Sequence, residues 1–230
     1  MWGELRSDNV VDAGLDQKDR GDMREILNVN ILPTNKYCSW ASMYAVINNC
    51  NTFLHYAPGV LNVDKNFSPG KLRTLEAEAL TIRALCYFYL VRTFRDVPWI
   101  NTPSIDDTQD YTVTKSPESE VLDSIIANLK TAQISARNEL GTVSQNKGRI
   151  TLNAVNALLA DVYLWDQKYS DCIDMCNRVI NDKSNSTNEP TFTLVSGIQA
   201  GNMLKKIFYT GNSTESIFEL QFNELSLIHI

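Results

Sequence analysis

One segment decides the fold, Lys71 to Ile100, which reads KLRTLEAEALTIRALCYFYLVRTFRDVPWI. At the helical spacing of about 100° per residue, apolar side chains cover most of the circumference between Leu75 and Phe94. A helix that is apolar on nearly all sides must be buried by several neighbours. Pro98 has no backbone N–H and disfavours helical dihedrals at Val97, so we expect the helix to end by about Arg95. The segment therefore predicts the central helix of a packed helical scaffold.

The uncharged part of this helix is too short to cross a bilayer. It runs from Ala84 to Val91 between Arg83 and Arg92, whereas a membrane-spanning helix needs about 20 apolar residues. The segment is therefore expected to be a core helix.

Composition and charge exclude several classes of protein. The chain has 230 residues, of which 43% are hydrophobic and 21% charged, which predicts a folded protein of one or two domains rather than a disordered one. Its net charge of −6 argues against nucleic acid as a partner, because binding phosphates requires clustered Lys and Arg.

The two ends of the sequence look like cut ends. The first residues, Met1 to Glu4, have neither the basic nor the apolar region of a secretion signal. Ser216 to Phe222 alternates like a strand, but no partner strand follows it. We expect the chain to be a fragment of a longer protein.

Four further helices are expected from apolar periodicity, caps and breaks. They cover residues 37–56, 118–140, 151–166 and 169–181. Ser116 is the expected N-cap of the second, with Pro117 at its first position, and Thr151 the expected cap of the third. The link between the last two is so short that they must form an antiparallel hairpin, with the residue spacing of a tetratricopeptide repeat. Beyond Asp182 the composition changes, which places a boundary near residues 183–191.

The five cysteines do not predict a metal site. They include no CxxC pair and have no closely spaced histidine. Cys172 and Cys176, four residues apart on one expected helix, are best explained as small core residues.

Four segments in this order and spacing resemble the SusD/RagB family of Bacteroidetes outer-membrane nutrient-uptake lipoproteins. They read EAEALTIRALCYFYLVRTFRDVPWI, SPESEVLDSIIANLKTA, KGRITLNAVNALLADVYLWDQKYSDCIDMCNRVI and ESIFELQF. The resemblance implies a mainly α fold of tetratricopeptide-like stacked helix hairpins with loop-rich ends. Residues 1–190 would form this scaffold with an N-terminal ligand-loop segment, and residues 191–230 would begin a truncated loop- and strand-rich region.

The resemblance also implies a function and a location. Members of the family dock on a SusC-type TonB-dependent transporter and capture glycans, without catalysis and without a cofactor. The full-length protein would lie on the cell-surface side of the outer membrane and touch the membrane only through a lipid anchor. This chain would enter after the anchor, near Glu4 to Asn9, and stop near mid-protein.

The sequence departs from the family at two places. Arg95 stands where the family has Gly before Asp-Val-Pro; if that position is left-handed, its Cβ costs roughly 1 kcal/mol or more. The family's ligand loop often carries aromatic rings, whereas Asn9 to Met23 contains none.

The candidate ligand-binding residues come from this N-terminal loop. Sugars are bound by flat aromatic faces and by planar polar groups that replace water at the hydroxyls. The residues of these kinds are Trp2, Asp8, Asn9, Asp12 and Arg20. The alternative is an ordinary solvated surface loop.

Other conspicuous residues have structural explanations. Trp40 and Trp165 lie among apolar residues on helices and are expected in the core, and Trp99 is expected to pack under a loop. Arg83 is expected to pair with a carboxylate of its own helix such as Glu78.

Two functions other than glycan capture are alternatives for this sequence. The hairpin over residues 151–181 is also typical of a tetratricopeptide adaptor that binds peptides, although only one clean repeat is present. A helical glycoside hydrolase would need two facing carboxylates, but Glu76 and Glu78 point about 200° apart. Because no Ser/His or Cys/His arrangement is present either, a non-catalytic binding protein is the leading hypothesis.

Overall fold

The structure, a computed structural model, describes residues 17–183, 191–195 and 200–221. The chain divides into two compact units, Met1–Tyr44 and Ala45–Ile230. The boundary predicted near residues 183–191 rests on a change in composition and does not coincide with the division after Tyr44. It stays a prediction.

The described part of the first unit is organised around the buried side chain of Asn35. It contains helix α1 (Gln17–Leu27) and a 3₁₀ turn, η2 (Lys36–Cys38). The Asn35 Nδ2 donates to the Asp22 carbonyl at 2.8 Å and to Glu25 Oε2 at 2.9 Å, while its Oδ1 accepts from the Tyr37 amide. One amide side chain thus holds the end of α1 to the cap of η2.

Helix α3 (Pro69–Phe94) is the centre of the second unit, as its sequence predicts. Ser68 caps it by accepting from the Lys71 amide, and Pro69 occupies the first turn, where its missing N–H costs nothing. Tyr87, Phe88 and Val91 are fully buried, and Tyr89 is the large apolar side chain of this helix that remains half exposed. The helix ends at Arg95, as predicted.

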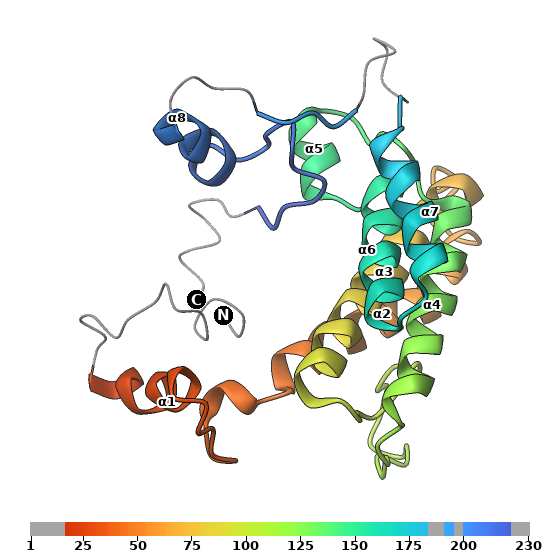
Figure 1. The fold of residues 1–230 in the computed structure, drawn as a ribbon. Helices are drawn as coiled ribbons and strands as arrows, with labels where there is room; N and C mark the ends of the chain where they lie inside the picture. Colours follow the sequence, from red (N-terminus) through yellow and green to blue (C-terminus); the bar gives the residue numbers. More distant parts are fainter. Residues whose placement is uncertain (1–16, 184–190, 196–199, 222–230) are drawn as a thin grey trace. The chain divides into compact units, whose positions relative to one another are not determined.

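Helices α4, α6 and α7 of the second unit pack one after another, starting from α3 (Figure 1). Helix α4 (Glu118–Ser135) contacts α3, helix α6 (Leu152–Trp165) contacts α4, and helix α7 (Tyr169–Ile180) contacts α6. The four α4 positions predicted to face inward are buried: Val121, Ile125, Leu129 and Ala132. Thr151 caps α6 as predicted, with its Oγ1 accepting from the Ala154 amide. The tetratricopeptide-like helical scaffold is confirmed.

Arg83 lies in the core and bonds to neutral amides rather than to Glu78, so that prediction was wrong. Its Nη1 donates to Asn51 Oδ1 at 2.7 Å and its Nη2 to Asn128 Oδ1 at 2.9 Å. Glu78 instead receives the guanidinium of Arg149, with Nε at 3.1 Å from Oε2. Arg149 is distant in sequence, which is why local spacing pointed to the wrong partner.

The loop after α3 is fastened to this core. The hydroxyl of Tyr87 donates to the Ile100 carbonyl at 2.9 Å and accepts from the Ile100 amide at 2.7 Å. Asn51 Nδ2 donates to the carbonyls of Ile100 and Thr102. Trp99 packs here, with its ring centroid 4.2 Å from that of Tyr87, as expected for a ring under a loop.

Several predicted helix limits need correction. Helix α2 (Ala41–Val60) begins later than Tyr37, because Asn35 draws residues 36–38 into η2, and it continues past Pro58, which falls in its last turn and removes a single bond. The N-cap residue of helix α4 is Pro117, without a side-chain capping bond, rather than Ser116, which instead bridges to Val97. It also ends at Ser135 and not at about residue 140.

A short helix that the periodicity missed explains where α4 ends. Helix α5 (Val143–Gly148) starts with a capping box formed by Thr142 and Gln145. Asn146 Oδ1 accepts from the amides of Leu140 and Gly141. These local bonds hold residues 140–142 in a turn that replaces a continued α4.

The described residues 216–221 form no strand, so the strand predicted over 216–222 was wrong there; Phe222 lies outside the described residues. The segment instead lies along α5, where the Glu219 amide donates to the Lys147 carbonyl at 2.7 Å and Gln221 bonds to Ser144. Alternation alone does not make a strand without a neighbour to pair with. Before this segment come helix α8 (Ala200–Leu204) and a π-helical turn, η3 (Lys205–Tyr209).

The cysteines are less uniformly buried than predicted. Cys50 and Cys86 lie in the core, but Cys176 is exposed, because it falls on the outer face of α7. The described residues contain no cluster of three side chains suited to hold a metal ion. Nor is any helix among them both long and apolar enough to cross a membrane.

Candidate ligand-binding site

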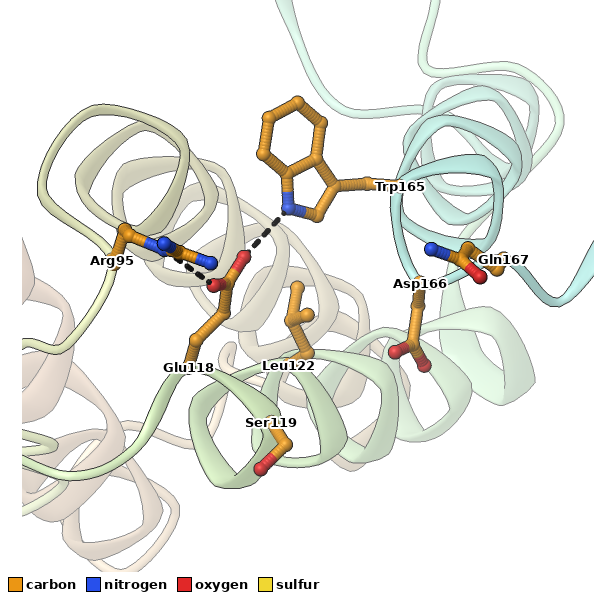
Figure 2. A pocket seen from close by; sticks show the side chains of 7 residues that line it. All are labelled: Arg95, Glu118, Ser119, Leu122, Trp165, Asp166 and Gln167. Atoms are coloured by element: carbon orange, nitrogen blue, oxygen red, sulfur yellow. Dashed lines mark hydrogen bonds and ion pairs between the residues drawn. The ribbon is translucent and has the colours of Figure 1, made fainter.

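A surface hollow of about 650 Å³ lies where three helices of the second unit end or begin (Figure 2). Arg95 reaches it from the end of α3, and Trp165 from the end of α6. The rest of its lining comes from the first turns of α4 and from the turn between α6 and α7: Glu118, Ser119, Leu122, Asp166 and Gln167. We call it the Trp165 hollow.

Trp165 is exposed over 46% of its surface, so the prediction that it is a core residue was wrong. As the last residue of α6, it projects beyond the packed part of the helix. Its Nε1 donates to Glu118 Oε1 at 2.9 Å, and its ring meets the buried ring of Phe88 edge-on at 6.4 Å. These two contacts fix the orientation of the indole while leaving ring surface in contact with solvent.

Glu118 connects the indole of Trp165 to the guanidinium of Arg95. Its Oε1 accepts from Trp165, while its Oε2 lies 3.3 Å from Arg95 Nε (Figure 2). Its own backbone amide donates to Asp96 Oδ1 at 3.0 Å, which fixes the start of α4. The carboxylate is therefore held by two partners and directs the indole and the guanidinium to the same side of the hollow.

Two residues that line the hollow have unfavourable backbone conformations. Arg95 has φ 62° and ψ −97°, and Gln167 has φ 58°. Positive φ costs a side chain with a Cβ roughly 1 kcal/mol or more. The sequence predicts strain at Arg95 on the condition that its backbone is left-handed. Its positive φ fulfils that condition. Strained non-glycine residues concentrate at functional sites.

Each cation around the hollow is paired with a carboxylate. Arg95 is paired with Glu118, and the Nζ of Lys168, just outside the lining, lies 2.7 Å from Asp166 Oδ2. The hydrogen bond that Lys168 donates to Asp166 raises the pKa of Lys168 above its usual range, with a smaller contribution from Asp123 at 3.5 Å. Two cations thus stand against three carboxylates, Glu118, Asp166 and Asp123, so the hollow offers hydrogen-bonding groups without an excess of positive charge.

The sequence-predicted ligand residues are elsewhere in the chain. Trp2, Asp8, Asn9 and Asp12 lie outside the described residues, and Arg20 falls within α1, in the first unit. The residues of the Trp165 hollow were not proposed as a site. A usable signal was present, because Trp165 directly precedes the polar turn Asp-Gln-Lys, where a helix leaves its packed neighbours.

A second hollow, of about 520 Å³, lies beside η3 and is less available to a ligand. Its two carboxylates are already engaged by the backbone: Glu215 accepts from the Val195 amide at 2.6 Å and Glu219 from the Asn212 amide. The Trp165 hollow is therefore the stronger candidate.

Comparison with known proteins gives the family. Residues 10–164 match a SusD-like family described as "Starch-binding associating with outer membrane". The chain belongs to the SusD-like family. That family consists of non-catalytic binding proteins associated with the outer membrane, in agreement with the expectation of a binding protein rather than an enzyme.

Individual SusD-like proteins support the assignment. SusD-like protein P2 of Formosa agariphila is 30% identical over 193 residues, which is 80% of this chain and 36% of that protein. The crystal structure of a SusD-like protein from Bacteroides fragilis superposes with a TM-score of 0.77 at 25% identity, covering 97% of this chain and 41% of that one. A laminarin-binding SusD-like protein gives a TM-score of 0.74 at 24% identity over 91% of this chain and 44% of that one. The chain thus spans less than half the length of each of these three relatives.

Proposed function

We propose that the chain is part of a SusD-like subunit that binds glycans or other nutrients at the cell surface for an outer-membrane import complex. The observation that carries the proposal is the family match over residues 10–164, together with a helical scaffold that superposes on SusD-like structures. In this proposal the full-length protein is held by a lipid anchor and pairs with a SusC-like TonB-dependent transporter.

The N-terminal loop is proposed to contact the ligand. Asp8, Asn9, Asp12 and Arg20 offer planar polar groups for sugar hydroxyls, and Trp2 offers a ring face. Laminarin is the natural first ligand to test, because a SusD-like protein of the same fold is named for binding it.

The function is tested by calorimetry with a panel of polysaccharides that includes laminarin and starch. We expect heat of binding with at least one glycan, and weaker binding when Asp12 is changed to Asn or Trp2 to Ala. Exposed Lys65→Ala in the loop after α2 serves as a control that leaves binding unchanged. Failure of the full-length protein to bind any glycan, oligosaccharide or peptide would refute the proposal.

The partner is tested separately. Affinity purification of the full-length protein from its own membranes is expected to recover a TonB-dependent transporter in a constant ratio. Recovery of the protein alone under mild detergent would count against the import complex but leave glycan binding intact.

A further inference from the structure

We infer that the Trp165 hollow is a second ligand site, which binds one ring of a neutral saccharide. The inference rests on the proposed glycan-binding function and adds to it a site formed by residues other than those of the N-terminal loop. The hollow is built from the unit Ala45–Ile230, whereas the loop candidates belong to the unit Met1–Tyr44.

The indole provides an oriented stacking surface. Its N–H is committed to Glu118 and its ring plane is perpendicular to that of Phe88, so the indole cannot turn freely. Nearly half of the side chain remains in contact with solvent. The aliphatic C–H groups of a pyranose stack on such a face, and a ring that is already oriented loses little entropy when it binds.

The polar groups stand on both sides of that surface. Figure 2 shows Arg95 and Glu118 at one end of the hollow, Asp166 and Gln167 at the other, and Leu122 and Ser119 between them. Carboxylate, amide and hydroxyl groups at these two ends offer donors and acceptors for the hydroxyls at the rim of a sugar ring. A volume of about 650 Å³ is within the range of small-ligand pockets, roughly 300–1,000 Å³.

The paired charges select for a neutral ligand. A uronic acid or sulfated sugar would have to compete with Glu118 for Arg95, or with Asp166 for Lys168, and would approach a second carboxylate in doing so. A neutral hexose meets no such opposition. The backbone strain at Arg95 and Gln167 bears on the presence of a site rather than on ligand charge, because such strain is concentrated at functional sites.

A second site would strengthen the hold on a long glycan. Two weak sites on one chain bind a polymer more tightly than either alone, provided that the polymer spans both. We therefore expect longer neutral glycans to bind better than short ones through a contribution that depends on Trp165.

The test follows the indole N–H of Trp165 by two-dimensional ¹⁵N NMR of the full-length protein. The resonance is assigned by its loss in Trp165→Phe. We expect it to shift on titration with at least one of laminarihexaose, maltohexaose and cellohexaose, and not with a hexamer of galacturonic acid at the same concentration. If none of the three neutral sugars shifts it, or if the acidic hexamer shifts it equally, the inference is wrong.

Variants give an independent measurement by calorimetry with the same sugars. Trp165→Ala is expected to weaken binding of the sugar that shifts the resonance by about tenfold or more, and Trp165→Phe by less, because a ring is retained. Tyr56→Ala, which removes an aromatic ring of similar exposure on α2, is the matched control and is expected to leave binding unchanged.

The outcomes separate this inference from the proposed function. Binding that is lost in the Trp2 and Asp12 variants but unaffected in Trp165→Ala would overturn the second site alone. Absence of binding to every glycan would overturn both.

Discussion

The guanidinium of Arg83 donates to the side-chain oxygen of Asn51 at 2.7 Å, inside the helical core. The same guanidinium reaches Asn128 of α4 and lies 5.9 Å from the ring of Trp99. A cation that is only 6% exposed is thus held by amide dipoles and an aromatic face instead of a carboxylate. Through it, one side chain of α3 joins α2, α4 and the loop after α3.

We predict that Arg83→Met destabilises the protein by about 2–4 kcal/mol, because it leaves the side-chain oxygens of buried Asn51 and half-buried Asn128 without their donor. Urea unfolding followed by circular dichroism measures the loss. Arg73→Met, the same change at an exposed position of α3, is the control and should stay within about 0.5 kcal/mol of the parent. Equal effects of the two substitutions would contradict the role given to Arg83.

Tyr87 should make stability fall at alkaline pH. Burial raises its pKa to about 12, against about 10 in the unfolded chain. Between these values the folded protein keeps a proton that the unfolded chain has lost, so the free energy of unfolding falls as pH rises, by roughly 2–3 kcal/mol in total. Stability from this group is complete below about pH 10 and lost toward pH 12.

The measurement compares Tyr87→Phe with the parent by urea unfolding at pH 9 and pH 11.5. Cys86, whose pKa burial raises to about 11, and all other groups titrate in both proteins. We expect the parent to lose more stability over this interval than the variant. An identical loss in both proteins would exclude Tyr87 as the source.

Glycine at position 95 should stabilise the protein relative to alanine. Both changes remove the exposed ion pair with Glu118, which contributes less than about 1 kcal/mol, but only glycine relieves the strain at φ 62°. Arg95→Gly should therefore be more stable than Arg95→Ala by about 1 kcal/mol, as read from thermal midpoints. A more stable alanine variant would show that the positive φ carries no cost.

The coupling energy of the ion pair between Glu78 and Arg149 should be larger than that of the more exposed pair between Arg92 and Asp161. Glu78 is 14% exposed in this pair, whereas Arg92 and Asp161 are 29% and 52% exposed in theirs. Double-mutant cycles with alanine are expected to give a coupling of about 1–2 kcal/mol for the first pair, and less than about 0.5 kcal/mol for the second. Comparable coupling energies would mean that burial of Glu78 does not matter.

The scaffold was predictable because its signals are local. The apolar circumference of α3, the inward face of α4 and the cap at Thr151 depend only on residues close in sequence. Alternation at residues 216–221 misled because a strand requires a partner, which periodicity cannot detect. The partner of Arg83 was also out of reach, since Asn51 and Asn128 lie 32 and 45 residues away.

The Trp165 hollow was missed for a related reason. The sequence predicts the helix end at residue 166, but helical spacing alone does not show that Trp165 lies outside the packed part of the helix, next to the ring of Phe88. Arg95 was recognised as a strained position, yet its pairing with Glu118 depends on how α3 and α4 meet. The chemistry of the hollow comes from three helix ends, and no single segment contains it.

Helix α7, which forms a hairpin with α6, buries few of its side chains against the scaffold. Of the twelve residues of α7 only Met175 and Val179 are buried, and an isolated helix of about this length is marginal in water. In this chain α7 should therefore detach and reform independently, and its amide protons should exchange with deuterium sooner than those of α3. Because Trp165 and Gln167 directly precede α7, such partial opening would reach the rim of the hollow first.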